Sequence, residues 1–449
     1  MPGKSSEGVG ASRVSVELSR VSGGVGACRV SGGVGACRAR CRAGWAGSRA
    51  GSGVPGCLSR VVRFIRDRKR NGKFTRLCDH APVNAPSTPT SGGTSPEPAP
   101  NSPGFAAEFK DAVTLRAFGL VLGGLLVQLA FVLSYVGAFH SPTPHRIPVA
   151  VVAPQQAAAK IVAQLNALDG EPVKAMTAAT EAEAREWVMT RRTDAAFLLD
   201  AQGTEDTLLV ASAGGPSVSQ TATQIAQKIE ASEKRRITVT DIRAPNSGDG
   251  RGMTSFYLVL GWVIGGYLTA TIMGMAAGSR PANRQRTLIR LGALLLYAVV
   301  SGVAGAVIVG PVFDALGGHF WALSAIGTLV VMASAATALA LQTLLGLLGT
   351  GLVILLFVVL GNPSSGGVYP APLLPAFWSA IGQALPPGAG TTLVRNTAYF
   401  SGHATTAALW VLVAYAVGGA ALAWGASWWR ERQAAGAGQE TPEESPAPA

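Results

Sequence analysis

The chain has 449 residues, of which 48% are hydrophobic and only 14% are charged, a balance too apolar for an ordinary soluble protein of that length. The formal net charge of +12 is carried by the first 80 residues, where 16 Lys and Arg stand against 4 Asp and Glu. Because nucleic-acid binding requires a basic face on a folded domain, this charge does not indicate a nucleic-acid partner. The composition points instead to a protein embedded in a lipid bilayer.

Residues 1–108 are predicted to be a disordered, low-complexity tail. The nine letters VSGGVGACR at 21–29 return directly at 30–38, and no apolar periodicity in this region would bury a core. The segment reads like a translated GC-rich repeat, so we expect the translation start to lie downstream. No second Cys or His pair stands at zinc-ligand spacing, so no metal site is predicted from the five cysteines, which are Cys28, Cys37, Cys41, Cys57 and Cys78.

The first transmembrane helix is predicted within residues 109–140. Residues 117–139 form an apolar run of 23 residues that only Gln128 and Ser134 interrupt. At 1.5 Å per residue this run is long enough to cross the ~30 Å hydrocarbon layer of a bilayer. No small-residue cleavage site follows Phe139, so the helix is interpreted as an uncleaved anchor.

Residues 146–249 change to the pattern of a water-exposed α/β domain. Short apolar runs, which are typical of strands, alternate with segments that have apolar residues at helical spacing. This alternation predicts a small sheet covered by helices. The expected strands are 147–153, 173–176, 195–199, 208–211 and 237–242, and the expected helices are 155–168, 180–192 and 217–232.

Five more apolar runs lie within residues 254–430, and the last residues, 431–449, are predicted to be a disordered tail. Each run is long enough to cross a bilayer, although the fourth is near the lower limit. The predicted fold is therefore an all-α membrane bundle of six transmembrane helices with an inserted extracytoplasmic α/β domain. The five runs are 256–277, 291–309, 320–341, 344–361 and 405–429.

The orientation is predicted from the positive charges that flank the apolar runs. If odd-numbered crossings run outward, all three basic clusters fall on the cytoplasmic side, as the positive-inside rule requires. Both termini are then cytoplasmic, the α/β domain lies outside, and the chain is a multi-pass protein of the cell (plasma) membrane. The clusters are Lys110 with Arg116, the loop that holds Arg280, Arg284, Arg286 and Arg290, and the pair Arg430 and Arg432.

Two GxxxG pairs lie inside predicted crossings, namely Gly119 with Gly123 and Gly261 with Gly265. Small residues at this spacing let helix backbones approach closely in lipid. The pairs are candidate helix-packing sites, either within one chain or on the face of a dimer.

The outer segment 361–403 holds the candidate gate. Its six prolines and seven glycines disfavour a continuous helix, but residues 373–385 place apolar side chains on one stripe, which predicts an amphipathic helix in the outer interface. The segment is either a structural lid over the bundle or a gate that substrate passes. The candidate gate residues are Asn362, Pro363, Phe377, Trp378, Arg395 and Asn396.

No enzyme is predicted. The chain has no GxxxxGK[ST] phosphate loop, no HExxH and no GxSxG elbow, and its five histidines are scattered over loops. No cofactor and no catalytic residue is therefore assigned. No carboxylate or histidine is evident at mid-membrane depth, where proton-driven transport usually needs one.

Four stretches of sequence resemble a known family. They are RIPVAVVAP at 146–154, GNPSSGG at 361–367, LLPAFW at 373–378 and PPGAG...VRNTAYFSG at 386–402. They resemble the membrane subunits of type-2 ABC exporters, and in particular the phage-infection-protein (YhgE/Pip-like) branch, over roughly residues 110–430. The resemblance implies a half-transporter that dimerises and is powered by a separate cytoplasmic ATPase. The arginine loop at 280–290 is the candidate docking site for that ATPase, although positive-inside retention explains those arginines equally well.

Two functions are therefore carried forward. The first is a homodimeric export permease that moves an amphipathic or polymeric substrate with the help of a partner ATPase. The alternative is a membrane scaffold, surface receptor or secretion-machinery component that transports nothing. An ATPase that co-purifies with the chain would separate the two.

Overall fold

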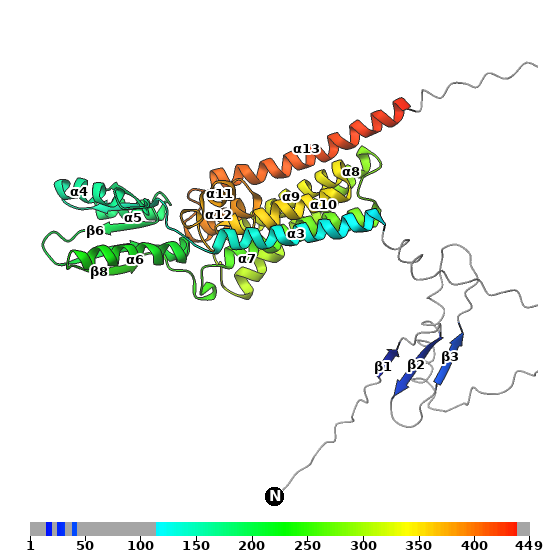
Figure 1. Cartoon of the computed structure of the whole chain (residues 1–449), viewed down its shortest axis with the longest axis horizontal. Coiled ribbons are helices and arrows are strands. Elements are labelled where there is room, and N and C mark those ends of the chain that lie inside the picture. The colour runs from blue at the N-terminus through cyan, green and yellow to red at the C-terminus, as the bar shows by residue number, and fades with distance from the viewer. Residues whose placement is uncertain (1–14, 20–24, 32–37, 43–113, 438–449) are drawn as a thin grey trace, which may run out of the picture. The chain divides into compact units, whose positions relative to one another are not determined.

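The computed structural model describes residues 15–19, 25–31, 38–42 and 114–437, which fall into two units (Figure 1). The first unit contains an antiparallel sheet of β1 (Ser15–Ser19), β2 (Val25–Ser31) and β3 (Arg38–Arg42). In this part of the predicted tail, β1 pairs with β2 and β2 pairs with β3. The rest of the predicted tail before residue 114 lies outside the described residues.

The second unit contains an α/β domain between two long helices. Its sheet has the order β5-β4-β6-β7-β8, with β6 and β7 antiparallel and the other neighbours parallel. The elements in chain order are β4 (Ile147–Val152), α4 (Gln155–Asn166), β5 (Val173–Thr177), α5 (Glu181–Met189), β6 (Ala195–Leu198), β7 (Glu205–Val210), α6 (Pro216–Ser232) and β8 (Arg236–Asp241).

Alternating residues of the strands supply the two faces of this sheet. Val149 and Leu208 face the side covered by α4 and α6, where Ala222 of α6 is also buried. Ala150 and Leu209 face the other side, which α5 covers. The sheet is thus a middle layer between helices.

A buried charge cluster joins the edge of the sheet to the end of α6. Arg235 donates from Nε and Nη2 to the two carboxylate oxygens of Asp206, at 2.6 and 2.7 Å. Although burial raises the pKa of Asp206, the hydrogen bonds from Arg235 and from the Asp200 amide hold it below its usual range. Burial, and then the neighbouring Asp206, raise the pKa of Glu230 to about 7.

This cluster makes the stability of the domain depend on pH. Between the ordinary glutamate pKa of 4.5 and about 7, the folded domain binds more protons at Glu230 than the unfolded chain does, so the free energy of unfolding falls as the pH rises. The loss is at most about 1.4 kcal/mol per pKa unit. We expect Glu230→Gln to flatten this dependence, and Glu186→Gln, at an exposed position on α5, to leave it unchanged. Hydrogen exchange of the β7 and β8 amides at pH 5 and pH 7.5 measures it, and an equal slope in all three proteins would contradict the assignment.

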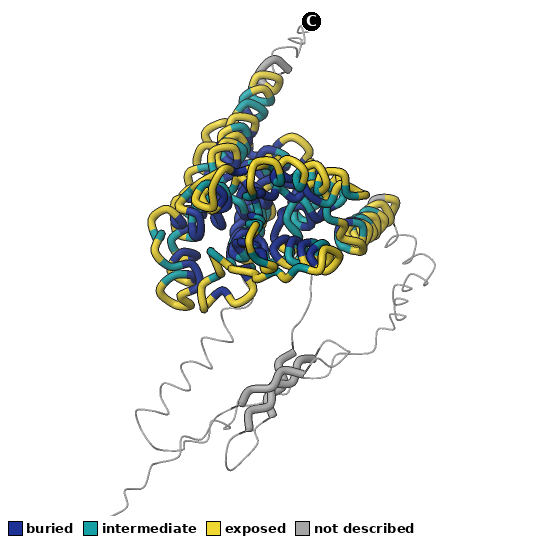
Figure 2. The backbone as a smooth tube through the Cα atoms, turned by 90° about the vertical axis from the view of Figure 1, so that its left-hand side faces the viewer, coloured by how far each residue is buried: buried dark blue, intermediate teal, exposed yellow. Residues whose placement is uncertain are grey.

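The helical bundle has five helices that are long and apolar enough to cross a membrane. They are α3 (Leu115–Phe139), α7 (Thr254–Ala277), α8 (Arg284–Val307, continued by a π-helical turn at Ile308–Val312), α9 (Phe320–Leu345) and α13 (Thr406–Ala437). Helices α7, α8 and α13 pack around α9, which is the most buried of the five. Figure 2 shows buried positions in the interior and exposed positions along the outer turns.

The fourth of the five later runs forms a shorter apolar element. It comprises α10 (Leu347–Ile354) and a π-helical segment, Leu355–Leu360, after a reversal at Gly346 with φ +64°. At 1.5 Å per residue, these 14 residues extend ~21 Å, which is less than the ~30 Å hydrocarbon layer.

Two later segments are helical where the sequence did not predict it. A helix α12 (Pro386–Tyr399) lies in the proline-rich outer segment, because Pro386 and Pro387 occupy its first positions, where a missing N–H costs no hydrogen bond. Helix α13 continues to Ala437 rather than ending at residue 430, since its last residues are mostly strong helix formers. The remainder of the predicted C-terminal tail, 438–449, lies outside the described residues.

The GxxxG pairs differ in their surroundings. A Cβ atom added at Gly119, Gly123 or Gly261 would meet no atom within 4 Å, whereas one at Gly265 would lie 2.8 Å from Tyr297 Oη. Within the part of the chain that the structure describes, nothing therefore packs closely at the first three glycines. The close helix approaches lie elsewhere, for example at Gly302, where a Cβ would lie 2.5 Å from the carbonyl oxygen of Ser324.

Candidate functional site

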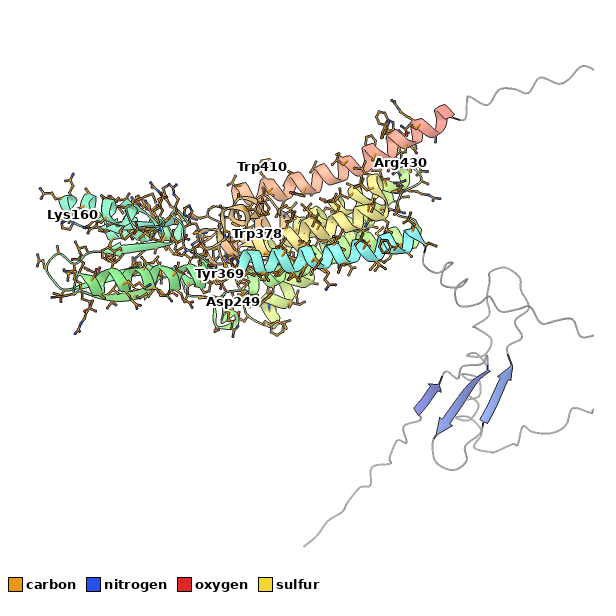
Figure 3. The ribbon with its side chains drawn as sticks, viewed as in Figure 1. Lys160, Asp249, Tyr369, Trp378, Trp410 and Arg430 are labelled. Carbon is orange, nitrogen blue, oxygen red and sulfur yellow. The ribbon has the colours of Figure 1, made fainter. Side chains whose placement is uncertain are left out.

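A set of buried polar contacts joins the α/β domain to one end of the bundle; we call it the junction, and define it by Arg243, Asp249, Arg395 and Tyr399 with the carbonyls of Gly214 and Gly366. Asp249 ends the connection from β8 to α7, while Arg395 and Tyr399 lie one turn apart on α12. Asp249, Tyr369 and Trp378 mark this region in Figure 3.

Asp249 ties the start of α7 to the end of α12. Its Oδ1 accepts from the amide N–H and the hydroxyl of Thr254, at 2.9 and 2.7 Å, and its Oδ2 accepts from the Tyr399 hydroxyl at 2.7 Å. The first N–H groups of a helix have no partner within that helix. The N-cap residue of α7, Met253, makes no side-chain hydrogen bond to them, and the Asp249 carboxylate takes this role instead. Burial, and then Asp249, raise the pKa of the Tyr399 hydroxyl above its usual range, so it stays a donor.

The linker after β8 adds two more contacts to the bundle. Arg243 donates from Nε to the carbonyl oxygen of Tyr399 at 2.6 Å. Asn246 donates from Nδ2 to the carbonyl oxygen of Ala315, in the loop between α8 and α9, at 3.1 Å. The linker is thereby held to two different parts of the bundle.

Arg395 lies at the centre of the junction and is 6% exposed. Its Nη1 donates to the carbonyl oxygens of Gly366, at 3.1 Å, and of Gly214, at 3.5 Å, whereas Nε and Nη2 have no hydrogen-bond partner among the described residues. Burial, and then the nearby Arg191 cation, lower the pKa of Arg395 to about 10, so the side chain is charged at neutral pH. A buried cation without a paired carboxylate lowers the stability of the protein. A residue that served only to stabilise the fold would not need such a charge, so Arg395 is a candidate for a functional role.

The Arg191 cation approaches the junction from the α/β domain. It pairs with Asp194 at 2.9 Å and lies over the ring of Phe400, 4.8 Å from the centroid. A Cβ atom at Gly214 would collide with the Arg191 guanidinium, so a larger residue at this position would require the Arg191 side chain to move.

The other predicted gate residues lie around the junction in different roles. Asn362 donates from Nδ2 to the Tyr135 hydroxyl of α3, and Pro363 starts a short buried 3₁₀ turn. Asn396 donates to the carbonyl oxygen of Ala404 at 3.4 Å and so holds the loop after α12. These three residues connect structural elements, and of the six candidates Arg395 alone combines deep burial, charge and unpaired N–H groups.

The predicted amphipathic stripe is not one helical face. Helix α11 covers only Ala376–Gly382, because Pro375 precedes it and Pro386 begins the next helix. Leu374 and Leu385 are buried outside α11, whereas Phe377 on it is 57% exposed. A Cβ on Gly137 of α3 would lie 3.9 Å from the half-buried Trp378 indole, which therefore packs near the end of α3.

The candidate docking loop lies at the other end of the bundle. Arg284 contacts Glu431 of α13 through its amide N–H, at 3.1 Å, and through Nε, at 3.8 Å. Arg290 is buried and donates to the carbonyl oxygen of Ala277 at 2.7 Å, so it is not available to a partner. Arg280, Arg284 and Arg286 are exposed.

The Tyr399 to Asp249 hydrogen bond is expected to stabilise the junction. Tyr399→Phe removes one donor from a buried carboxylate and should lower the free energy of unfolding by ~1–3 kcal/mol. In a protein that already carries Asp249→Asn, Tyr399→Phe should lower the free energy of unfolding by less, because the hydrogen bond no longer involves a charged acceptor. Thermal unfolding of the two single variants and the double variant measures the coupling, and strictly additive losses would contradict it.

Sequence reasoning selected Arg395 but missed Asp249, Tyr399, Arg243 and Arg191. The meeting of the β8–α7 linker with α12 brings Asp249, Arg243 and Tyr399 together, and Arg191 reaches them from the connection between α5 and β6. The one available signal was that Asp249 comes shortly before an apolar run, in the position of an acidic residue near a helix start.

Comparison with known proteins gives one match. The profile of a family described as ABC-2 family transporter protein matches residues 118–428, which is more than half of the chain. No curated protein and no solved structure matches the chain. The match spans the long apolar helices, the α/β domain and the junction alike. The chain therefore belongs to the ABC-2 family of transporter proteins, as a multi-pass membrane permease subunit.

Proposed function

We propose that the chain is the membrane subunit of a homodimeric ABC type-2 exporter of the YhgE/Pip-like branch, energised by a separate ATPase. The observation that carries the proposal is the junction, because it couples an α/β domain to the transmembrane bundle through a buried, incompletely paired Arg395. The stretches that resemble the branch, GNPSSGG and PPGAG...VRNTAYFSG, supply Gly366, Arg395 and Tyr399 to this junction.

The proposed topology has six crossings, with 347–360 as the short one, both termini in the cytoplasm and the α/β domain outside the plasma membrane. Its support is the separation of charges along the bundle. Arg280 approaches the turn at Gly346, and Arg284 contacts Glu431, so the arginine-rich segments gather at one end. The junction lies at the other end, as Arg430 and Asp249 show in Figure 3.

The exposed Arg280, Arg284 and Arg286 are the proposed docking surface for the ATPase. Arg284 and Arg286 occupy the first turn of α8, where the helix dipole disfavours cations and no acidic residue of that turn offsets them, although Glu431 of α13 contacts Arg284. An acidic surface on a partner would remove this repulsion. Positive-inside retention requires the same charges, so the two roles are compatible.

The conformational change is proposed to pass through α12. This helix packs against α7, α9 and α13 and also touches the 3₁₀ turn Ser212–Gly214 of the α/β domain. Movement of the bundle at the ATPase end would therefore shift Arg395 relative to Gly214. The π-helical segments Ile308–Val312 and Leu355–Leu360 are places where helices commonly rearrange.

Helix α3 is the proposed dimer face. Only 6% of its apolar window is buried, and its contacts with the rest of the chain lie in its second half, at Ser134, Tyr135 and Ala138. Gly119 and Gly123 in the first half have open space beside them. A second copy packed there would use the GxxxG spacing that this chain leaves unfilled.

The test is association with an ATPase in native membranes. Full-length chain purified in mild detergent should bring down an ATPase, identified by mass spectrometry, and Arg284→Glu with Arg286→Glu should reduce its recovery about tenfold. Lys228→Glu, an equal charge change on an exposed face of α6, is the matched control. Recovery of no ATPase by the unaltered chain would contradict the proposal and favour the scaffold or receptor alternative.

A further inference from the structure

A cavity of about 440 Å³ lies within the α/β domain, away from the junction. Its walls are α4 and α6, which cover the same face of the sheet, and its floor is formed by strands β4, β6 and β7. This space opens to solvent between the two helices, and its volume lies in the range of small-molecule pockets, which start at about 300 Å³. The space is therefore suited to a ligand.

The walls and the floor of this cavity are mainly apolar. Ile161 and Leu165 of α4 face Ile225 and Ile229 of α6, above Phe197 and Leu208 of the sheet. Leu165, Phe197 and Ile225 are only partly buried, although they belong to the core on this face. An apolar chain or ring placed between the helices would cover them and gain the hydrophobic free energy that the empty cavity forgoes.

One end of the cavity is polar. Lys160 of α4 and Glu230, Glu233 and Arg235 near the end of α6 line it, and Lys160 lies at the end of the domain distant from Asp249 (Figure 3). Glu230 is 4% exposed, and its Oε2 lies 3.8 Å from Arg235 Nε. Glu230 and Glu233 are the acidic side chains at this end, so a ligand group that donates a hydrogen bond suits it better than one that only accepts.

The charges at this end select the head group of the ligand. Arg235 is not free to bind an anion, because its guanidinium already donates to Asp206 and to the carbonyl oxygens of Gly203 and Asp200. The remaining groups are the Glu230 and Glu233 carboxyls and one lysine. A carboxylate or phosphate head would meet these acids, whereas a hydroxyl or amine would donate to Glu230.

We propose that the cavity between α4 and α6 binds a small amphiphile, with its apolar part on the sheet and a hydroxyl or amine head at the acidic end lined by Glu230 and Glu233. The inference concerns a binding equilibrium of the α/β domain, so it stands whether or not the chain exports anything. It also places the ligand away from Arg395, at a site separate from the junction.

The test uses the full chain in lipid nanodiscs and the fluorescent probe N-phenyl-1-naphthylamine, an apolar molecule with one N–H donor. After subtraction of the signal from empty nanodiscs, we expect saturable binding of one probe per chain. Ile225→Trp fills the cavity and should weaken this binding at least about tenfold. Gln227→Trp adds the same side chain on the exposed side of α6 and should leave the affinity unchanged.

Competition tests the head group. Decanol should displace the probe at concentrations about tenfold lower than decanoate does, and Glu230→Gln should reduce that preference. Thermal unfolding of each variant shows whether the domain is still folded, and a variant that unfolds is replaced by Ile161→Trp on the opposite wall. A linear signal equal to that of empty nanodiscs, equal binding by the cavity-filling variants, or equal displacement by decanoate would overturn the proposal.

Discussion

Substitution of Gly419 by alanine is expected to disrupt the bundle severely. This glycine lies on α13 where that helix crosses α9, and an added Cβ would lie 2.7 Å from both the carbonyl carbon of Ala336 and the amide nitrogen of Thr337. Both atoms belong to backbone, so no side-chain rotation relieves the overlap and the two helices must separate. Overpacking of this kind costs ~1–3 kcal/mol, and here it acts on the most extensive helix contact of the bundle.

The neighbouring Gly418 supplies a control on the same helix. A Cβ at Gly418 would meet nothing within 4 Å. Gly418→Ala therefore makes the same substitution on the same helix without a steric overlap. Alanine is also the better helix former by ~1 kcal/mol, which favours a neutral or slightly stabilising outcome. Unfolding of both variants in mixed micelles with increasing dodecyl sulfate measures the difference, and equal losses would mean that α9 and α13 do not pack as described.

Replacement of Arg395 by methionine is expected to separate stability from function. The guanidinium is buried, lacks a paired carboxylate and leaves Nε and Nη2 without partners, so an apolar side chain of similar length should keep or raise the free energy of unfolding. The link from α12 to the carbonyl oxygens of Gly214 and Gly366 is lost with it. We therefore expect at least a tenfold loss of transport-dependent phenotype in a protein that is still folded.

Thr392→Met provides the comparison for this variant. Thr392 lies on the same helix, is only partly buried, and its hydroxyl contacts Gln383 rather than the α/β domain. This variant should retain the phenotype. A large loss of stability in Arg395→Met, or unchanged phenotype with normal expression, would show that Arg395 merely fills space.

The sequence predicted the structure well wherever one hydrophobic pattern extended over a whole element. The 23 apolar residues at 117–139 could only be a long helix, and α3 covers them. It was less informative at 344–361, where hydropathy gave the apolar length but not the shorter, partly π-helical element that follows the reversal at Gly346. Hydropathy measures the length of an apolar run, but it does not reveal a residue with positive φ, such as Gly346, at which one helix ends and the next begins.

The candidate site was predictable only in part. Arg395 was selected, together with Asn396, as a polar group of the proline-rich outer segment. Its burial against Gly214 could not be foreseen, because the contact joins residues 181 positions apart in the sequence. The helix α12 was missed because prolines were counted against a helix, although Pro386 and Pro387 stand where a helix accepts them.

Membrane sidedness of the two ends of the bundle is the most direct test of the permease assignment. With the five native cysteines replaced by serine, Gln227→Cys reports on the α/β domain and Gln433→Cys on the end of α13. A membrane-impermeant maleimide added to intact cells should label residue 227 and should reach residue 433 only after the membrane is opened. Labelling of residue 433 from outside, with residue 227 protected, would contradict the proposed arrangement.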